Sequence, residues 1–84
     1  MKIIVLNLPR TTTRDDLFKL FKPHGSIQSC TIVMDKQSGT SKGFGFVQMP
    51  DQHHAALAIK NLNGHMIGDK RLRVKVSEAV DKMA

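Results

Sequence analysis

The sequence has no tryptophan, no tyrosine and a single cysteine, Cys30, among its 84 residues. One cysteine cannot form an internal disulfide, which is typical of proteins from a reducing compartment. Long apolar runs are also missing, since the run at residues 3–6 is far too short to cross a bilayer or to form a signal peptide. We therefore expect a cytoplasmic protein with no membrane partner. A bacterial cytoplasm is favoured, and a eukaryotic nucleus is the alternative.

Negative charge is scarce relative to positive charge. Thirteen lysines and arginines stand against seven aspartates and glutamates, which leaves a formal net charge of +6. Such a surplus on a small domain attracts polyanions, nucleic acid before anionic membrane. Because basic proteins are also common for reasons of solubility, the placement of the cations in the fold has to decide between these interpretations.

The chain lacks the residue clusters that hold metals. His53 and His54 are adjacent, so on a helix their side chains diverge by about 100° and cannot share one ion. His24 and His65 fall in other predicted elements, and the sequence offers no cysteine pair. We therefore expect no metal and no cofactor.

Hydrophobic periodicity predicts four strands and two helices. The strands are expected at residues 3–6, 27–34, 44–49 and 71–76. The first helix follows threonine hydroxyls that can cap its start, and the second ends at an Asn-Gly pair. Their apolar stripes consist of Leu17, Leu20 and Phe21 in the first helix and of Ala55, Ala58, Ile59 and Leu62 in the second.

This order, β-α-β-β-α-β, places the chain in the α+β class. It predicts a ferredoxin-like βαββαβ sandwich, in which a four-stranded antiparallel sheet is backed on one face by two helices. We expect one domain over residues 1–79 and a short C-terminal tail at residues 80–84. Acylphosphatase-like hydrolases share this order, but residues 8–13 contain Arg10 and no glycine where such an enzyme needs a glycine-rich loop. No nucleophile–base pair is evident either, so we do not expect an enzyme.

Strand alternation predicts which side chains face away from the helices. In the last strand the apolar residues at positions 72, 74 and 76 must face the helices, because the opposite choice would bury three cations. Arg71, Arg73 and Lys75 are then expected on the open face of the sheet.

The third strand places two of the four phenylalanines on the same open face. Gly45 and Val47 suit the side that packs under the helices, which sends Phe44, Phe46 and Gln48 outward. The first strand, with Ile3 and Val5 inward, adds Lys2, Ile4 and Leu6 to the open face. An exposed pair of rings bordered by cations is typical of nucleic-acid binding, because bases stack on the rings and phosphates pair with the cations.

Residues 42–49, KGFGFVQM, closely resemble the octapeptide motif K/R-G-F/Y-G/A-F-V-x-F/Y of the RNA recognition motif family. Only Met49 departs from the specified positions, and alternation places it in the core. Residues 3–8, IIVLNL, resemble the six-residue motif of the family's first strand. In overall pattern the chain is similar to small stand-alone bacterial proteins of this family and to the domain of plant glycine-rich RNA-binding proteins; a fragment of a longer protein is equally compatible.

The resemblance implies a monomeric binder of short single-stranded RNA, acting in post-transcriptional regulation or as an RNA chaperone. Phe44 and Phe46 would stack bases, Lys42 would pair with a phosphate, and Asn7 would position a base or the backbone. Ile4 stands where the family most often has an aromatic ring, so we expect weaker binding or an altered nucleotide preference there. Alternation and resemblance together give the expected RNA-binding residues Lys2, Ile4, Asn7, Lys42, Phe44, Phe46, Gln48, Arg71, Arg73 and Lys75.

Two other functions remain open at this point. Single-stranded DNA is an alternative ligand, because stacking tolerates it and only contacts to the 2′-hydroxyl exclude it. The sheet could instead bind a protein, or the tail could fold over the aromatic pair through Val80 and Met83.

Overall fold

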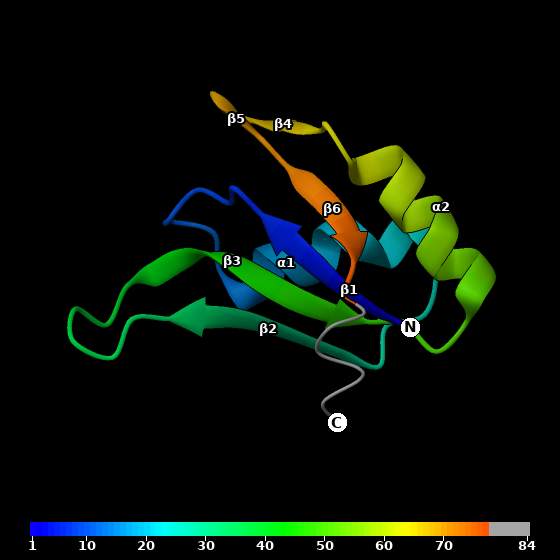
Figure 1. Cartoon of the computed structure of the whole chain (residues 1–84), viewed down its shortest axis with the longest axis horizontal. Helices are drawn as coiled ribbons and strands as arrows, with labels where there is room; N and C mark the ends of the chain where they lie inside the picture. The colour runs from blue at the N-terminus through cyan, green and yellow to red at the C-terminus, as the bar shows by residue number, and fades with distance from the viewer. Residues whose placement is uncertain (78–84) are drawn as a thin grey trace.

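The structure, a computed structural model, describes residues 1–77, which form an open sheet packed against two helices (Figure 1). The strands of the main sheet lie in the order β2-β3-β1-β6, and every neighbouring pair is antiparallel. The predicted α+β sandwich is therefore confirmed. The elements are β1 (Lys2–Leu6), α1 (Arg14–Phe21), the 3-10 turn η1 (Lys22–His24), β2 (Ser29–Met34), β3 (Ser41–Gln48), α2 (Gln52–Leu62), β4 (Met66–Ile67), β5 (Lys70–Arg71) and β6 (Arg73–Val76).

Helix α1 begins at a reciprocal cap. The Thr13 hydroxyl accepts a hydrogen bond from the backbone N–H of Asp16 at 3.1 Å, and the Thr13 N–H donates to the Asp16 carboxylate at 3.1 Å. This capping box satisfies two donors that the helix cannot satisfy internally. The helix then buries Leu17 and Phe21 against the sheet, with Leu20 partly buried beside them, as the apolar stripe predicted.

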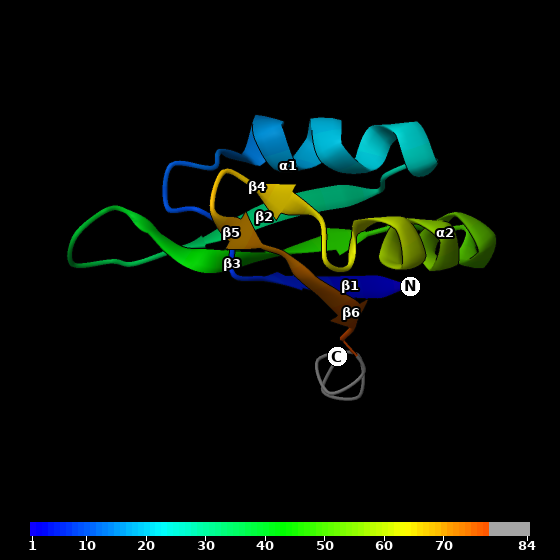
Figure 2. The same ribbon diagram turned by 90° about the horizontal axis from the view of Figure 1, so that it is seen from above.

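Helix α2 begins at Asp51, whose side chain accepts from the backbone N–H groups of His53 and His54. Its buried face consists of Ala55, Ala58 and Leu62, and two small residues on that face let the helix axis approach the sheet closely. Figure 2 shows the molecule from above, with α1 on one side of the strands. The sheet face turned toward the viewer in Figure 1 is the opposite face.

The core lies between the sheet and the helices. Its largest fully buried side chains are Phe21, Ile3, Leu17, Met49, Leu72, Val5 and Val47. The predicted placement of Met49 in the core is therefore confirmed, and Cys30 is buried in the same core, at 3% exposed. Both results follow from strand alternation, which the sheet preserves on its covered side.

The predicted last strand, residues 71–76, is wrong at its start. The main-sheet strand β6 begins at Arg73, whereas Arg71 belongs to β5, which pairs with β4 in a separate two-stranded hairpin. The physical reason is a tight turn at Gly68, whose φ of 61° lies in the left-handed region, so the chain folds back between Ile67 and Lys70. Arg71 is exposed on this hairpin and does not lie on the main sheet.

Smaller differences occur at the β2–β3 hairpin. Strand β2 begins at Ser29, two residues later than predicted, and β3 begins at Ser41, three residues earlier. Ser41 pairs with Met34 after a register shift that follows Ile32, so the early part of β3 extends the hairpin beyond its apolar segment. Polar strand residues of this kind carry no hydrophobic alternation from which they could have been predicted.

Candidate nucleic-acid interface

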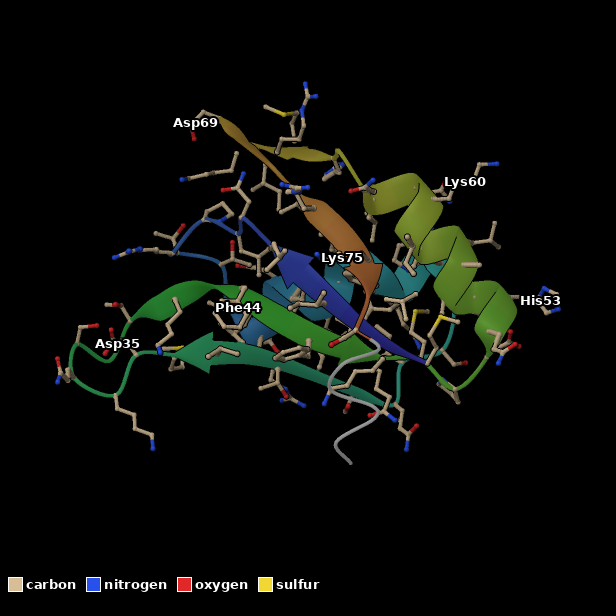
Figure 3. The ribbon with its side chains drawn as sticks, in the orientation of Figure 1. Asp35, Phe44, His53, Lys60, Asp69 and Lys75 are labelled. Carbon is tan, nitrogen blue, oxygen red and sulfur yellow. The ribbon has the colours of Figure 1, made fainter. Side chains whose placement is uncertain are left out.

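The open face of the sheet carries two neighbouring aromatic rings. Phe44 and Phe46 project from β3, both half-buried, and their ring centroids lie 6.1 Å apart at an interplanar angle of 83°. Gly45 and Val47 alternate with them toward the helices and are buried. Figure 3 shows Phe44 on β3 and Lys75 on β6, on the sheet face opposite α1. The predicted orientation of the third strand is therefore the one the structure has.

Strand register aligns the open-face side chains in rows across the sheet. Thr31 of β2, Phe46 of β3, Ile4 of β1 and Lys75 of β6 are consecutive cross-strand partners. A second row joins Ser29, Gln48 and Lys2, and Arg73 pairs with Leu6. Each row thus has a polar edge on β2, and the cations gather on β1 and β6 beside an apolar centre. A flexible single strand laid on this face can stack on the centre while its phosphates reach the border.

The ammonium of Lys2 covers one of the two rings. Its Nζ lies 5.1 Å from the centroid of the Phe46 ring, within the range of a cation–π contact. This contact holds a cation over the centre of the open face. Lys2 therefore stands both beside the aromatic pair and within reach of any anion that approaches it.

Gly45 is required for the close approach of β2 and β3. A Cβ at this position would overlap the backbone carbonyl oxygen of Thr31 on the neighbouring strand. Gly43 is required for a different reason, because its φ of 88° lies in the left-handed region that side chains disfavour. The two glycines therefore set the path of the strand that carries Phe44 and Phe46.

Asn7 ends β1 in a left-handed conformation, with a φ of 63°. Its side-chain amide nitrogen donates a hydrogen bond of 2.7 Å to the carbonyl of Arg71 on β5. The predicted contact between Asn7 and a ligand remains a prediction, and the structure adds a second role. Asn7 ties the end of β1 to the β4–β5 hairpin.

A groove adjoins Phe44 at this end of the sheet. It has a volume of about 360 Å³, and three of its lining side chains are cations from three separate segments: Arg10 from the β1–α1 loop, Lys42 from β3 and Lys70 from β5. We call it the basic groove; its lining residues are Leu6, Asn7, Leu8, Arg10, Lys42, Gly43, Phe44 and Lys70. The sequence did not predict that Arg10 and Lys70 lie beside Phe44, because Arg10 lies in a loop and Lys70 lies in the hairpin, which the strand pattern did not predict.

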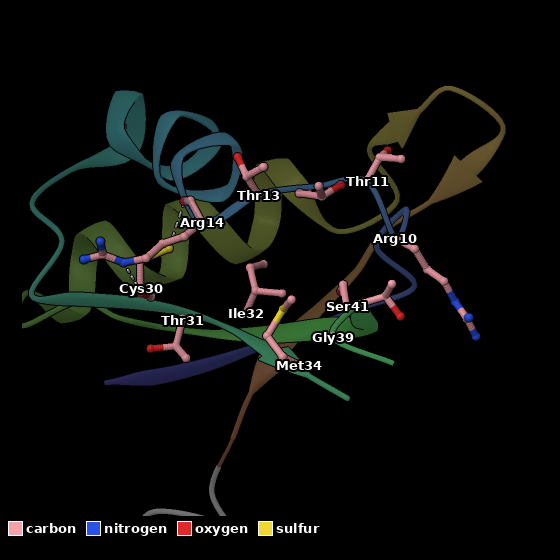
Figure 4. A pocket seen from close by; sticks show the side chains of 12 residues that line it. Arg10, Thr11, Thr13, Arg14, Cys30, Thr31, Ile32, Met34, Gly39 and Ser41 are labelled. Carbon is pink, nitrogen blue, oxygen red and sulfur yellow. Dashed lines mark hydrogen bonds between the residues drawn. The ribbon is translucent and has the colours of Figure 1, made fainter. Parts of the chain in front are cut away.

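A larger cavity, of about 520 Å³, lies on the other side of β2 (Figure 4). Figure 4 shows Ile32 and Met34 pointing from the strand toward Thr11 and Thr13, whereas Thr31 points the other way. This cavity therefore faces the helix side of the sheet and does not extend the aromatic surface.

Arg14 and Cys30 lie at one end of that cavity. The Nε of Arg14 donates to the Cys30 carbonyl at 2.8 Å, and the Cys30 Sγ donates to the Arg14 carbonyl at 3.6 Å. Burial raises the pKa of the Cys30 thiol, which keeps it in the neutral form. Arg14 thereby occupies a backbone carbonyl of the edge strand β2. An unpaired carbonyl on an edge strand can form β-sheet hydrogen bonds with another chain.

Within residues 1–77, no group of three or more histidine, cysteine, aspartate or glutamate side chains is placed to hold a metal ion. None of the helices in that part of the chain is both long enough and apolar enough to span a membrane.

Comparison with known proteins gives a consistent family. The family model described as RNA recognition motif matches residues 3–73. The chain is 32% identical over 77 residues to small ribosomal subunit protein cS22 of Arabidopsis thaliana, covering 92% of this chain and 30% of that protein. It is 42% identical over 72 residues to protein Elav of Drosophila melanogaster, covering 86% of this chain and 15% of that protein. The chain thus spans less than a third of the length of these relatives.

Among solved structures, the chain is similar to one described as a complex of the Sex-lethal protein with RNA. The TM-score is 0.87 at 37% sequence identity, with 90% of this chain and 46% of that chain covered.

Proposed function

This chain belongs to the RNA recognition motif family, and from that membership and the surface of its sheet we propose that it binds short single-stranded RNA. The observation that carries the proposal is the Phe44–Phe46 pair on the open face, with ring centroids 6.1 Å apart. A base stacked on an aromatic side chain contributes about 1–3 kcal/mol. Stacking on the two rings therefore contributes affinity for RNA that depends little on the base sequence.

The cations around the pair supply the contacts to phosphate. Lys2, Arg73 and Lys75 border the rings on β1 and β6, and Lys42 lies on the same strand as Phe44. Phosphate contacts position a nucleic acid and make its binding sensitive to salt, but they carry little sequence information. Sheets of this family stack two or three bases, so we propose a site of two to four nucleotides.

Ile4 limits this site. It lies between Phe46 and Lys75 in the central row of the sheet, where the family most often has an aromatic ring. An aliphatic side chain offers apolar contact to a base but no flat ring to stack on. We therefore propose weaker binding at this position than at the Phe44 and Phe46 positions.

RNA is favoured over a protein partner by the chemistry of the same face. A protein-binding surface commonly has an apolar centre depleted in charge, whereas here a cation lies over one of the two rings. The complex of the Sex-lethal protein is described as containing RNA, which favours the same choice. Single-stranded DNA remains the second candidate ligand, because stacking on Phe44 and Phe46 does not require a 2′-hydroxyl.

We propose a binding module and not a hydrolase. The loop after β1 contains Arg10 without a glycine, so it does not form the phosphate-holding loop that such an enzyme needs. The one thiol, Cys30, is buried and has a raised pKa, so it is not placed as a nucleophile.

The proposal is tested by a fluorescence anisotropy titration of fluorescein-labelled RNA and DNA pentanucleotides of random sequence. The parent is compared with the double variant Phe44→Ala/Phe46→Ala and with the matched control Phe18→Ala, which removes an exposed ring from helix α1. Circular dichroism verifies that each variant is folded. Loss of RNA binding in the double variant alone is the expected result, and equal binding by all three proteins would contradict the proposal. The ratio of the RNA and DNA affinities decides between the two ligands.

The predicted tail at residues 80–84 lies outside the described residues, and so do Val80 and Met83. The proposal that this tail covers the aromatic pair therefore remains a prediction, as does the domain boundary at residue 79. A chain that ends at Ser77 should bind RNA more tightly than the full chain if the tail covers the sheet, and equally tightly if it does not.

A further inference from the structure

The basic groove is built from three segments that are distant in sequence. The β1–α1 loop contributes Arg10, the start of β3 contributes Lys42, and the β4–β5 hairpin contributes Lys70. Phe44 lines the groove and is also one of the two rings of the open face. The groove therefore continues the aromatic surface beyond the last ring, at the end of the sheet where β1 finishes and β3 begins.

Hydrogen bonds fix the walls of this groove. The Asn7 amide nitrogen donates to the carbonyl of Arg71 at 2.7 Å, which holds the hairpin against the end of β1. The Leu8 N–H donates to the carbonyl of Gly43 at 2.8 Å, which holds the loop against β3. The backbones that carry the three cations are therefore placed by the fold, so ligand binding has to order their side chains but not these segments of the chain.

The positive charge of the groove has no acidic partner among residues 1–77. None of the lining residues is acidic, and none of the three groove cations lies within 4.0 Å of a carboxylate oxygen in the described part of the chain. Lys42 and Arg10 do act on one carboxylate, Asp35, but its pKa is lowered mainly by the N–H groups of Gln37 and Ser38 and less by these two cations. Asp35 is thus committed to its own loop, and the groove cations are available to an anion.

The size and lining of the groove suit a sugar–phosphate chain. A volume of about 360 Å³ is at the lower end of the range of ~300–1,000 Å³ that ligand pockets occupy. Lysine and arginine are the side chains that pair with phosphate, and Phe44 is the groove's one ring, which the proposed function already assigns to a base. The groove therefore offers charge to a backbone and no further platform to a base.

We propose that the basic groove is a second RNA subsite, which holds the phosphates of nucleotides beyond the base stacked on Phe44. This inference rests on the proposed function, because it extends the same bound strand off the sheet. The groove makes Arg10 and Lys70 RNA-binding residues and makes the β4–β5 hairpin part of the interface. RNA longer than the stacked nucleotides then binds more tightly through its backbone alone.

The test compares a uridine trinucleotide with the same trinucleotide extended by two abasic ribose-phosphate units, at the 5′ end in one oligonucleotide and at the 3′ end in another. For the parent, the extension at one end should raise the affinity by about tenfold at low salt, with a salt slope steeper by about 0.7 for each phosphate held. The double variant Arg10→Gln/Lys70→Gln should lose this gain and bind the trinucleotide like its charge-matched control. Lys42 is kept, because it also serves the sheet.

That control is the double variant Lys19→Gln/Lys60→Gln, which removes the same charge from exposed positions on α1 and α2. It should keep the gain from the extension, because both lysines lie on the helices and not at the groove. The inference is overturned if the extension gives the parent no gain, if both double variants lose the gain equally, or if the gain requires bases on the added units.

A further oligonucleotide distinguishes failure of the proposed RNA binding on the sheet from failure of the groove proposal. If the parent does not bind the trinucleotide, a wholly abasic pentamer tests the groove alone. Its binding should then be lost in the Arg10→Gln/Lys70→Gln variant and retained in the Phe44→Ala/Phe46→Ala variant. Absence of pentamer binding by the parent, or its loss in the phenylalanine variant instead, overturns the groove proposal.

Discussion

The Lys2 ammonium lies 5.1 Å from the centroid of the Phe46 ring, so a cation covers one of the two rings that we propose carry bases. A cation–π contact at an exposed site contributes about 0.5–1 kcal/mol, less than the ~1–3 kcal/mol of a stacked base. A base can therefore displace the ammonium from the ring. Lys2 is then placed to pair with a phosphate of the bound strand.

Replacing Lys2 by methionine tests this exchange, because methionine keeps much of the side-chain length without the charge. We expect Lys2→Met to weaken RNA binding a few-fold at low salt and to reduce the salt slope by about 0.7, which corresponds to one phosphate of a single strand. The measurement is a titration at several salt concentrations, with Lys60→Met on α2 as the control. A salt slope equal to that of the parent would show that Lys2 contacts no phosphate.

Ile4→Tyr should strengthen RNA binding. Ile4 is the direct cross-strand partner of Phe46, so a ring at this position would extend the aromatic platform on β3 across to β1. One additional stacked base contributes about 1–3 kcal/mol, and we expect a gain of roughly tenfold in affinity. Ile4→Leu is the control for a change of shape without a ring. No gain from the tyrosine relative to the leucine would mean that no base lies over this position.

Gly45→Ala should destabilise the fold by about 3 kcal/mol, as expected when a side chain is forced into a packed site. The added methyl group would overlap the carbonyl oxygen of Thr31 on β2, which is backbone and cannot turn aside. The free energy of unfolding, measured with urea, checks this value. Gly39→Ala is the control, because open space surrounds that loop glycine and only its left-handed backbone, at about 1–2 kcal/mol, opposes the change. Equal losses in the two variants would show that the close approach of β2 is not what requires Gly45.

The sequence predicts which side chains lie on the open face, because only one orientation of each strand buries its apolar side chains in the core. If Phe44 and Phe46 faced the helices, the polar side chain of Gln48 would be buried and Val47 would lie outward, whereas the structure buries Val47 and leaves Gln48 partly exposed. The same reasoning places Met49 and Leu72 inward, where both are fully buried. Strand alternation is therefore informative wherever one face of a strand must be apolar.

The basic groove could not be predicted in the same way. Arg10 lies in a loop that has no periodicity, and Lys70 lies in a hairpin of two-residue strands that alternation cannot reveal. Alternation predicts Arg71 on the main sheet, because it continues the pattern of β6, although a turn at Gly68 puts it in the hairpin. The Gly68-Asp69 pair is the one sequence signal that could have indicated this turn.

The stability of the domain should fall in acid. Hydrogen bonds to their carboxylates lower the pKa of Asp16, through the Thr13 N–H and then its hydroxyl, and that of Asp51, through the N–H groups of His54 and His53. Because the folded-state pKa lies below the unfolded value near 3.8, this stabilisation is complete above the unfolded pKa and is lost as the pH falls through the folded pKa. We expect the urea midpoint to decline as the pH is lowered from about 5 to about 2.

The variant Asp16→Asn/Asp51→Asn should flatten that decline, because the amide oxygen of asparagine can accept the same N–H hydrogen bonds without titrating in this range. Asp69→Asn, on the β4–β5 turn, is the control, because it changes one carboxylate that caps no helix. A decline of unchanged steepness in the double variant would assign the acid sensitivity to other groups.

Asn7→Gly separates the two roles of Asn7. Glycine accepts the left-handed φ of 63° but removes the hydrogen bond to the Arg71 carbonyl, at a cost of about 1 kcal/mol in the free energy of unfolding. If Asn7 acts only by holding the hairpin, the variant should bind the uridine trinucleotide like the parent and lose most of the gain from an abasic extension. If Asn7 contacts a stacked nucleotide directly, the affinity for the trinucleotide falls as well. Asn63→Gly, at the C-cap of α2, is the matched control, because it also removes one hydrogen bond between a side chain and the backbone: its Oδ1 accepts from the Val74 N–H at 3.2 Å. Its trinucleotide affinity and its extension gain should both equal those of the parent.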